Sequence, residues 1–317
     1  MPLRLSAVVF LISISGLGAN QTHNHLGAGN KTVTTLHVTL QRQIPNLQPA
    51  QDKSTNDYKI TTTTEAWKAS ETAVIICDMW DSHHCYRAVK RQEQMVPQME
   101  KVLNNLRSKG VTIIHAPSSC VTAYANNPAR LRVASIPESA GPDGINKWCH
   151  SIPSEERVTY PLDQSDGGAD DTPEEHARWS ASLKTMGLNP RAPWKKQHQG
   201  LTIDPAKDFI SDQGDEIWNI LKHRELKNVI LLGVHTNMCV LGRPFGLRQL
   251  AKNRVHVVLM RDLTDSMYNP KSWPHVSHLE GNALIIAHIE RHVCPTLTSD
   301  QFVGGKPFRF TPITTDR

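Results

Sequence analysis

The chain has 317 residues, of which 38% are hydrophobic and 21% charged, so it can form one large α/β domain or two small ones and is not a disordered chain. Its 35 basic and 30 acidic residues give a net charge of +5 and are spread along the sequence. Because nucleic-acid-binding surfaces need clustered Lys and Arg, we expect a mildly basic protein that binds no nucleic acid.

The first 19 residues have the layout of a secretory signal peptide. Arg4 supplies a short positive region, residues 5–14 are apolar, and small residues follow at the expected cleavage site. This stretch is short for a membrane span, although an uncleaved anchor is the alternative. No later segment is apolar enough to cross a bilayer. We therefore predict an exported protein, periplasmic or secreted, with no integral membrane segment after cleavage.

The rest of the chain divides by composition. Residues 20–65 are rich in Thr, Gln, Asn and His and lack helical periodicity, which indicates a tether or an extended chain on the domain surface. We expect the folded domain over residues 66–300 and a C-terminal tail over residues 301–317. Residues 118–199 interrupt the domain with many Pro, Asp, Gly and Ser, and an insertion of this length is usually functional or mobile. A helix over residues 173–187 is expected within it.

Short apolar runs alternate with amphipathic segments through the domain. The predicted strands are 72–80, 111–117, 228–234 and 255–260, and the predicted helices are 88–110, 212–226, 236–253 and 278–292. Strand–helix alternation of this kind indicates an α/β fold with three layers, in which a mostly parallel, doubly wound sheet carries helices on both faces. Six cysteines are too few for a disulfide scaffold, and their pairing is left open.

Three reactive side chains follow the carboxyl ends of predicted strands, which is where such sheets bind their ligands: Asp78, His115 and Cys239. Cys239 would lie in the first turn of its helix, with Thr236 or Asn237 as the N-cap. Unpaired N–H groups and the helix dipole stabilise a thiolate at this position. The alternative is a small buried hydrophobic residue.

Asp78 strengthens the interpretation that Cys239 is a nucleophile. A carboxylate at the end of a buried strand is costly unless it is paired or used. It either caps the following helix or accepts the proton of Cys239. In the second case the two residues form a nucleophile and base, as covalent catalysis requires.

These segments resemble the isochorismatase-like cysteine hydrolases, a family that includes nicotinamidase and N-carbamoylsarcosine amidase. Their first-strand motif resembles AVIICDMW (residues 73–80), and their nucleophile motif, Gly-x-x-Thr-x-x-Cys-Val, resembles LLGVHTNMCV (residues 231–240). The following strand with its acidic end resembles VVLMRDLTDSM (residues 257–267). The resemblance covers residues 72–291, interrupted by the insertion, and implies the isochorismatase-like fold.

The resemblance implies a catalytic triad of Cys, Asp and Lys and an acyl-enzyme on Cys239. Backbone N–H groups near His235 and Cys239 would bind the oxyanion, and the Val234–His235 peptide would be cis. The lysine has no clean match in the sequence: Lys196 is favoured, with Lys195 as the alternate. Either lysine could instead be merely solvated, and without one the mechanism is altered or activity is lost.

Metal binding is a separate question. Asp81, His83, His84 and His115 cluster at the predicted sheet edge and could bind zinc; the alternative is that the histidines line the substrate or pack in the core. Nicotinamidases carry an Asp-x-His metal motif after the second strand, where this chain has HAPSSC. We therefore predict no firm metal site and no required cofactor.

The sequence predicts a cysteine-dependent amidohydrolase of a small amide or ureido substrate, acting on C–N bonds other than peptide bonds. The predicted substrate-lining residues are His115, Trp80 and Asn237, and the insertion with its tryptophans is expected to form much of the pocket. One alternative is a catalytically silent binding protein with the same fold. Another is an isochorismatase-type vinyl-ether hydrolase, which would not need the thiol. A homo-oligomer is expected.

Overall fold

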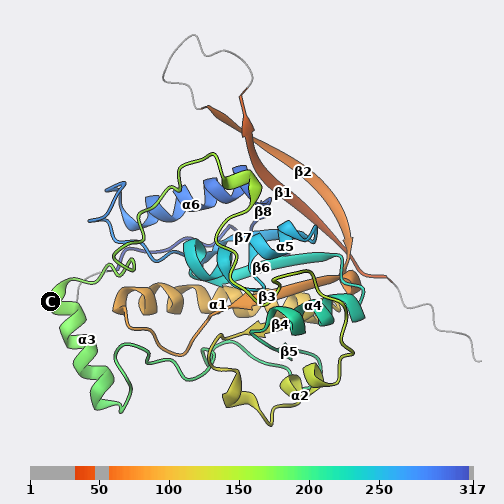
Figure 1. The fold of residues 1–317 in the computed structure, drawn as a ribbon, viewed down its shortest axis with the longest axis horizontal. Coiled ribbons are helices and arrows are strands. Elements are labelled where there is room, and N and C mark those ends of the chain that lie inside the picture. Colours follow the sequence, from red (N-terminus) through yellow and green to blue (C-terminus); the bar gives the residue numbers. More distant parts are fainter. Residues whose placement is uncertain (1–32, 47–56, 314–317) are drawn as a thin grey trace, which may run out of the picture. The chain divides into compact units, whose positions relative to one another are not determined.

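The computed structural model describes residues 33–46 and 57–313, and these belong to one compact unit. The predicted signal peptide lies outside the described residues. Four parallel strands form the centre of the sheet: β3 (Thr72–Cys77), β4 (Thr112–Ala116), β6 (Asn228–Val234) and β7 (His256–Asp265). The whole sheet has eight strands in the order β2-β1-β8-β7-β6-β3-β4-β5 (Figure 1). Every residue of β3 and β6 is buried, as expected for strands covered on both faces.

Successive side chains of β3 pack on opposite faces of the sheet. Ala73 and Ile75 contact a cluster that includes α4 (Gly214–His223), α5 (Leu247–Lys252) and α6 (His278–His292). Val74 and Ile76 belong to the other cluster, with α1 (Tyr86–Ser108) and α7 (Asp300–Val303). The sheet therefore lies between two helical layers, which confirms the predicted fold class.

The sequence left two forms open for residues 20–65, a tether or an extended chain on the domain surface. The described part is extended chain that belongs to the sheet, so the predicted domain start at residue 66 is too late. β1 (Thr35–Pro45) and β2 (Tyr58–Lys68) form an antiparallel hairpin, and β1 pairs with β8 (Thr296–Leu297) at the sheet edge. The first half of β1 alternates exposed and buried residues, and its buried side chains join the α1 layer. This two-residue period is a strand signal that the polar composition obscured.

The insertion carries short elements joined by irregular chain. They are η2 (Val121–Tyr124), α2 (Pro128–Ala134), η3 (Pro153–Glu155) and α3 (Pro173–Thr185), and β5 (Phe209–Ile210) follows them. Helix α3 matches the expected helix. Its start is fixed by a capping box, in which the Thr172 hydroxyl accepts from the Glu175 N–H and the Glu175 carboxylate accepts from the Thr172 N–H. A further 3-10 turn, η1 (Ala69–Glu71), joins β2 to β3.

The helix predicted over residues 236–253 is broken in the structure. A π-helical turn, η4 (Thr236–Val240), is followed by a turn through residues 243–246, and α5 begins at Leu247. Pro244 lies in this turn, and because proline has no backbone N–H it cannot continue a helical hydrogen-bond ladder. The break leaves Arg243 at the end of the nucleophile segment. None of the helices in the described ranges is long and apolar enough to span a membrane.

Candidate active site

The candidate site lies at the carboxyl ends of β3 and β6, which are neighbours in the sheet. Cys77, the last residue of β3, pairs with Gly233 of β6. Gly233 has a φ of +111°, and a Cβ there would lie 2.1 Å from the carbonyl oxygen of Cys77. Only glycine permits this approach. It brings Asp78, which follows β3, close to the η4 turn that carries Cys239.

The carboxylate of Asp78 is fully buried, accepts two hydrogen bonds and forms an ion pair. Oδ1 accepts from the Ser118 backbone N–H at 2.9 Å. Oδ2 accepts from Arg243 Nε at 3.0 Å, and Arg243 Nη2 lies 2.9 Å from the same oxygen in an ion pair. Asp78 also has a φ of 51°, a left-handed conformation that is uncommon for residues other than glycine. The arginine therefore acts as a fixed counter-ion on one oxygen of a buried carboxylate.

Burial raises the pKa of Asp78 above its usual value of 3.8. The charge of Arg243 opposes this rise, as do hydrogen bonds from Ser118 and Cys239, but they do not cancel it. A carboxylate with a raised pKa and a thiol beside it is suited to accept a proton from that thiol. This is the role that the sequence predicted for Asp78.

Cys239 lies within the η4 turn and is almost fully buried. Burial, together with the charge of Asp78, raises the pKa of its thiol to about 12. Arg243 and the backbone N–H of His235 act in the opposite direction. The helix N-terminus alone would stabilise the thiolate, but burial outweighs it here, so the pKa of the thiol is raised and a base is needed to remove its proton.

The turn around Cys239 is held by side chains that were expected to cap a helix. His235, not Thr236 or Asn237, occupies the N-cap position. The Thr236 hydroxyl lies 2.7 Å from the hydroxyl of Thr264 in β7. The Asn237 amide donates to the carbonyl of Met267 at 2.7 Å and accepts from its N–H at 2.8 Å. Asn237 thus fixes the turn, so its amide is already used. The Val234–His235 peptide is cis, at the bond where the resemblance implied it.

The cation beside Asp78 is Arg243 and is neither of the two lysines that the sequence favoured. Lys195 and Lys196 are exposed, and their backbone N–H groups donate to Asp81 Oδ1 at 2.9 and 3.3 Å. Across residues 33–46 and 57–313, the cation in contact with Asp78 is Arg243. The sequence carried one signal for it: Arg243 lies four residues after Cys239, a spacing that puts both on one face of a helical segment.

Aromatic rings lie just beyond the carboxyl end of β3. Trp80 stacks on Trp194 of the insertion with ring centroids 4.9 Å apart and lies 6.1 Å from the ring of His235. The ring of His83 is also parallel to Trp80, at 6.0 Å. Burial lowers the pKa of His83 well below its usual value and that of His235 to about 3, so both imidazoles are neutral. Trp80 is buried and its indole N–H donates to the carbonyl of Ser118, so its substrate-lining role stays a prediction.

The predicted metal candidates do not come together. The His115 ring is fully buried, with Nδ1 2.8 Å from Gln197 Oε1 and Nε2 3.1 Å from Asp208 Oδ2, so it has no free ligand atom. His83 Nδ1 accepts from a backbone N–H, and Asp81 binds the backbone of the two lysines. The Nδ1 atom of His84 is buried without a hydrogen-bond partner. Within the described ranges these four residues form no cluster with metal-ligand spacing.

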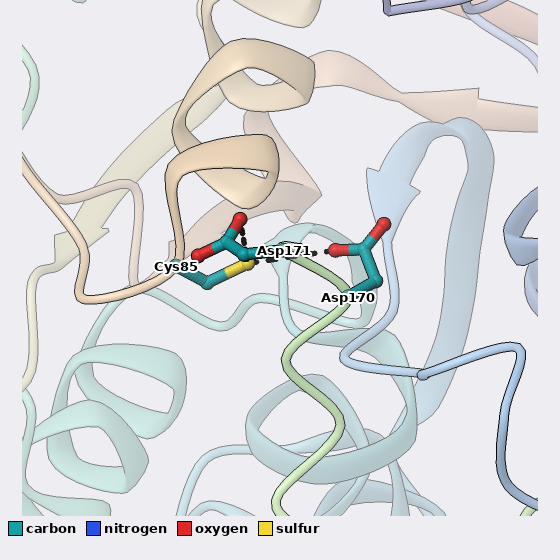
Figure 2. Close-up of side chains that lie close together, drawn as sticks. All are labelled: Cys85, Asp170 and Asp171. Carbon is teal, nitrogen blue, oxygen red and sulfur yellow. Dashed lines mark hydrogen bonds between the residues drawn. The ribbon is translucent and has the colours of Figure 1, made fainter. Parts of the chain in front are cut away.

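A different group does have its ligand atoms within 4.8 Å of one another: Cys85, Asp170 and Asp171 (Figure 2). Their charges are already compensated. Asp170 binds both Nη atoms of Arg91, at 2.8 and 3.0 Å. Asp171 accepts from the first backbone N–H groups of α1 and so acts as a cap for that helix. These contacts anchor the insertion to α1.

The insertion also walls a cavity of about 460 Å³ beside η4. Trp148 and Tyr160 come from the insertion, whereas Met238 and Gly242 come from the nucleophile segment. The Tyr160 hydroxyl donates to the carbonyl of Asn237 at 2.6 Å. The expectation that the insertion shapes the surroundings of the nucleophile thus agrees with its position.

No family model and no curated protein matches the chain. Several solved structures are similar to it. A cysteine hydrolase from Pseudomonas syringae pv. phaseolicola is 17% identical, with 74% of this chain and 92% of that chain covered and a TM-score of 0.44. An isochorismatase from Pseudomonas putida is 11% identical over the same shares, with a TM-score of 0.43. An isochorismatase-like hydrolase from Alkaliphilus metalliredigens is 14% identical, with 74% and 96% covered and a TM-score of 0.40.

Proposed function

We propose that the chain is an isochorismatase-like cysteine hydrolase that cleaves a small amide or ureido compound through an acyl-enzyme on Cys239. The observation that carries the proposal is the joint placement of a protonated thiol, a buried carboxylate with a raised pKa and a fixed cation at one edge of a parallel sheet. Ligands bind at this edge in open α/β sheets. Covalent catalysis needs a nucleophile with its base close by, and Asp78 and Cys239 are near enough for each to shift the pKa of the other.

In the acylation step, Cys239 Sγ forms a bond to the substrate carbonyl carbon while its proton moves to Asp78. The C–N bond then breaks, and Asp78 returns that proton to the leaving nitrogen, which departs as ammonia or an amine. A thioester remains on Cys239. In the second step, water attacks the thioester carbon and gives a proton to Asp78. The C–S bond breaks, Asp78 returns the proton to the sulfur, and the carboxylic acid leaves.

Arg243 has a supporting role that differs from that of a lysine. Its guanidinium stays charged throughout and cannot act as an acid at neutral pH. It donates a hydrogen bond from Nε to Asp78 Oδ2 and forms an ion pair with that oxygen, which favours the ionised carboxylate despite its burial. It also lowers the pKa of Cys239 against the effect of burial. Arg243 therefore replaces Lys196 and Lys195 as the proposed cation of the triad.

The oxyanion donors and the independence from a cofactor are also part of the proposal. Backbone N–H groups near His235 and Cys239 would hold the oxyanion, because preorganised donors beside the nucleophile stabilise the charge that develops in the transition state. No step needs a cofactor, since Asp78 can activate both the thiol and the water. Export and a homo-oligomeric state also remain predictions.

The catalytically silent binding protein is the second candidate. It is favoured by one observation, the absence of a lysine in contact with Asp78 in the described part of the chain. In that case Arg243 and Asp78 form a structural ion pair, and Cys239 is a buried thiol without turnover. The vinyl-ether hydrolase alternative gives the thiol no task and leaves its contact with Asp78 unexplained.

Ammonia release from a panel of small primary amides and ureido compounds separates these candidates. The wild-type chain is compared with Cys239→Ala, and circular dichroism confirms that both are folded. We expect release by the wild type and none by the variant, because no other group at the turn can form the covalent intermediate. Release by neither protein supports the silent candidate. Equal release by both removes Cys239 from the mechanism.

A further inference from the structure

The insertion contacts the proposed catalytic cation directly. The guanidinium of Arg243 lies over the indole ring of Trp148, with Cζ 4.8 Å from the ring centroid. The same guanidinium donates from Nε to Asp78 Oδ2 at 3.0 Å and forms an ion pair with that oxygen through Nη2 at 2.9 Å. Trp148 is therefore separated from the proton acceptor by a single side chain, although the two residues are 70 positions apart in the sequence.

Two backbone features hold Trp148 in this place. The N–H of Cys149 donates to the carbonyl of Gly242 at 2.8 Å. A Cβ on Gly242 would lie 2.8 Å from the indole ring, closer than real Cβ contacts, so the ring packs against a site that only glycine leaves open. Three interactions thus hold residues 148–149 on residues 242–243: the stack of the indole on the guanidinium, the backbone hydrogen bond, and the packing of the indole against Gly242.

Trp148 is not simply a core residue. Its side chain is 39% exposed, and it does not belong to the hydrophobic clusters of the described chain. The face that it turns inward meets a cation, and tryptophan is the best aromatic partner for one. Arginine has a long side chain that loses rotamer freedom when it is held in one geometry. The indole ring of Trp148 and the carboxylate of Asp78 restrict the guanidinium of Arg243 from two directions.

We propose that Trp148 is a positioning residue, which holds the guanidinium of Arg243 on Asp78 and so links the docking of the insertion to the reactivity of Cys239. The inference rests on the proposed roles of Asp78 and Arg243. The reactivity of the thiol can nevertheless be measured without a substrate, so the two proposals can fail separately.

The test compares the alkylation of Cys239 by iodoacetate and by iodoacetamide, resolved by mass spectrometry of its peptide in the full chain. The two reagents are similar in size, so a change in access alters both rates alike. Their ratio reports the positive charge beside the sulfur. In Trp148→Ala we expect the iodoacetate-to-iodoacetamide ratio to fall by about 2- to 5-fold, the size of one cation–π contact. Trp148→Phe should restore most of it.

A second variant displaces the ring without removing it. Gly242→Ala places a methyl group against Trp148, so we expect the same fall in the ratio with all aromatic groups present. The matched control is Tyr58→Ala. It removes another arginine–aromatic stack, with Arg291 at 4.1 Å, which joins β2 to α6 and includes neither Asp78 nor Cys239. The ratio should not change in this variant.

The alkylation ratios either support or overturn the positioning role of Trp148. An unchanged ratio in folded Trp148→Ala and Gly242→Ala overturns it, and so does an equal fall in Tyr58→Ala. If the ratio falls as expected but the wild type hydrolyses no amide, the positioning role stands and the proposed hydrolase activity fails. If amides are hydrolysed and the ratio is unchanged, only the positioning role fails.

Discussion

Asp78 and Asp265 occupy equivalent places in the sheet, yet their pKa values move in opposite directions. Each is a buried carboxylate at the carboxyl end of a parallel strand, β3 or β7, and each accepts from an arginine. Burial raises the pKa of Asp78 despite Arg243. Burial acts the same way on Asp265, but Arg91 and His278 together hold its pKa well below the usual range.

The difference lies in how fully neighbouring cations and donors compensate the negative charge of each carboxylate. Asp265 accepts from Arg91 Nε at 2.7 Å on one oxygen and lies 2.9 Å from His278 Nε2 on the other. Arg91 also binds Asp170 and so joins the insertion to the sheet. Asp78 has one cation on one oxygen and a thiol as neighbour. A saturated carboxylate holds the structure together, whereas a partly compensated one beside a thiol can take up a proton.

The largest expected effect is on catalysis through Asp78. Asp78→Asn keeps the shape of the side chain and removes the proton acceptor, so amide hydrolysis should fall by about 10²- to 10⁴-fold. Ammonia release measures this, with urea unfolding as the folding control. Hydrolysis within a few-fold of the wild type in a folded Asp78→Asn variant would contradict the assignment of Asp78 as the base.

The matched change at the second site should act on stability instead. Asp265→Asn leaves Arg91 buried with only Asp170 as a full negative partner, and breaking a buried ion pair typically costs about 3–5 kcal/mol of the free energy of unfolding. Urea unfolding at neutral pH measures this loss. A variant that is as stable as the wild type would show that Asp265 does not have the structural role assigned to it.

Arg243 should produce an intermediate effect. Arg243→Gln removes the charge on Asp78 Oδ2, so the pKa of Asp78 should rise further and less of it should be ionised. Hydrogen bonds to charged groups contribute about 1.5–3 kcal/mol, which corresponds to a loss of about 10- to 100-fold in hydrolysis rate. Arg243→Lys should recover only part of it, because an ammonium group cannot donate in the same fork geometry. Full activity of Arg243→Gln would leave the triad without its proposed cation.

The two carboxylates should also respond oppositely to pH. Asp265 has a lowered pKa, so its contribution to stability is present above its usual value of 3.8 and is lost as the pH falls further. Asp78 has a raised pKa, so its ionisation reduces stability as the pH rises above 3.8. From pH 4 to pH 7, Asp78→Asn should therefore become more stable relative to the wild type. Urea unfolding at the two values tests the sign, and the opposite trend would contradict the raised pKa.

The smallest effect is expected at the lysines. Lys196→Met should change amide hydrolysis by less than about twofold, because exposed charges interact weakly through water and the side chain is exposed. The same rate assay applied to Lys195→Met serves as a comparison. A large loss in either variant would return that lysine to the site at the expense of Arg243.

The sequence was sufficient for the features that depend on local pattern. Apolar runs predicted the central strands, and the order of Asp78 before Cys239 predicted that both lie at one sheet edge. Arg243 was missed because its contact with Asp78 joins segments 165 residues apart, which local periodicity does not show. The raised pKa of Cys239 was missed because burial depends on tertiary packing. The β1–β2 hairpin was missed because the alternating apolar residues of β1 lie in a segment that is mostly polar.

The central claim is that hydrolysis proceeds through an acyl group on Cys239, and trapping with hydroxylamine tests it most directly. Hydroxylamine competes with water for a thioester, so it diverts an acyl-enzyme to a hydroxamate without any need for the intermediate to accumulate. With the amide that the wild-type chain hydrolyses fastest, we predict hydroxamate in proportion to the hydroxylamine added, and none with Cys239→Ala. Release of ammonia with the carboxylic acid as the only product at every hydroxylamine concentration would contradict the acyl-enzyme.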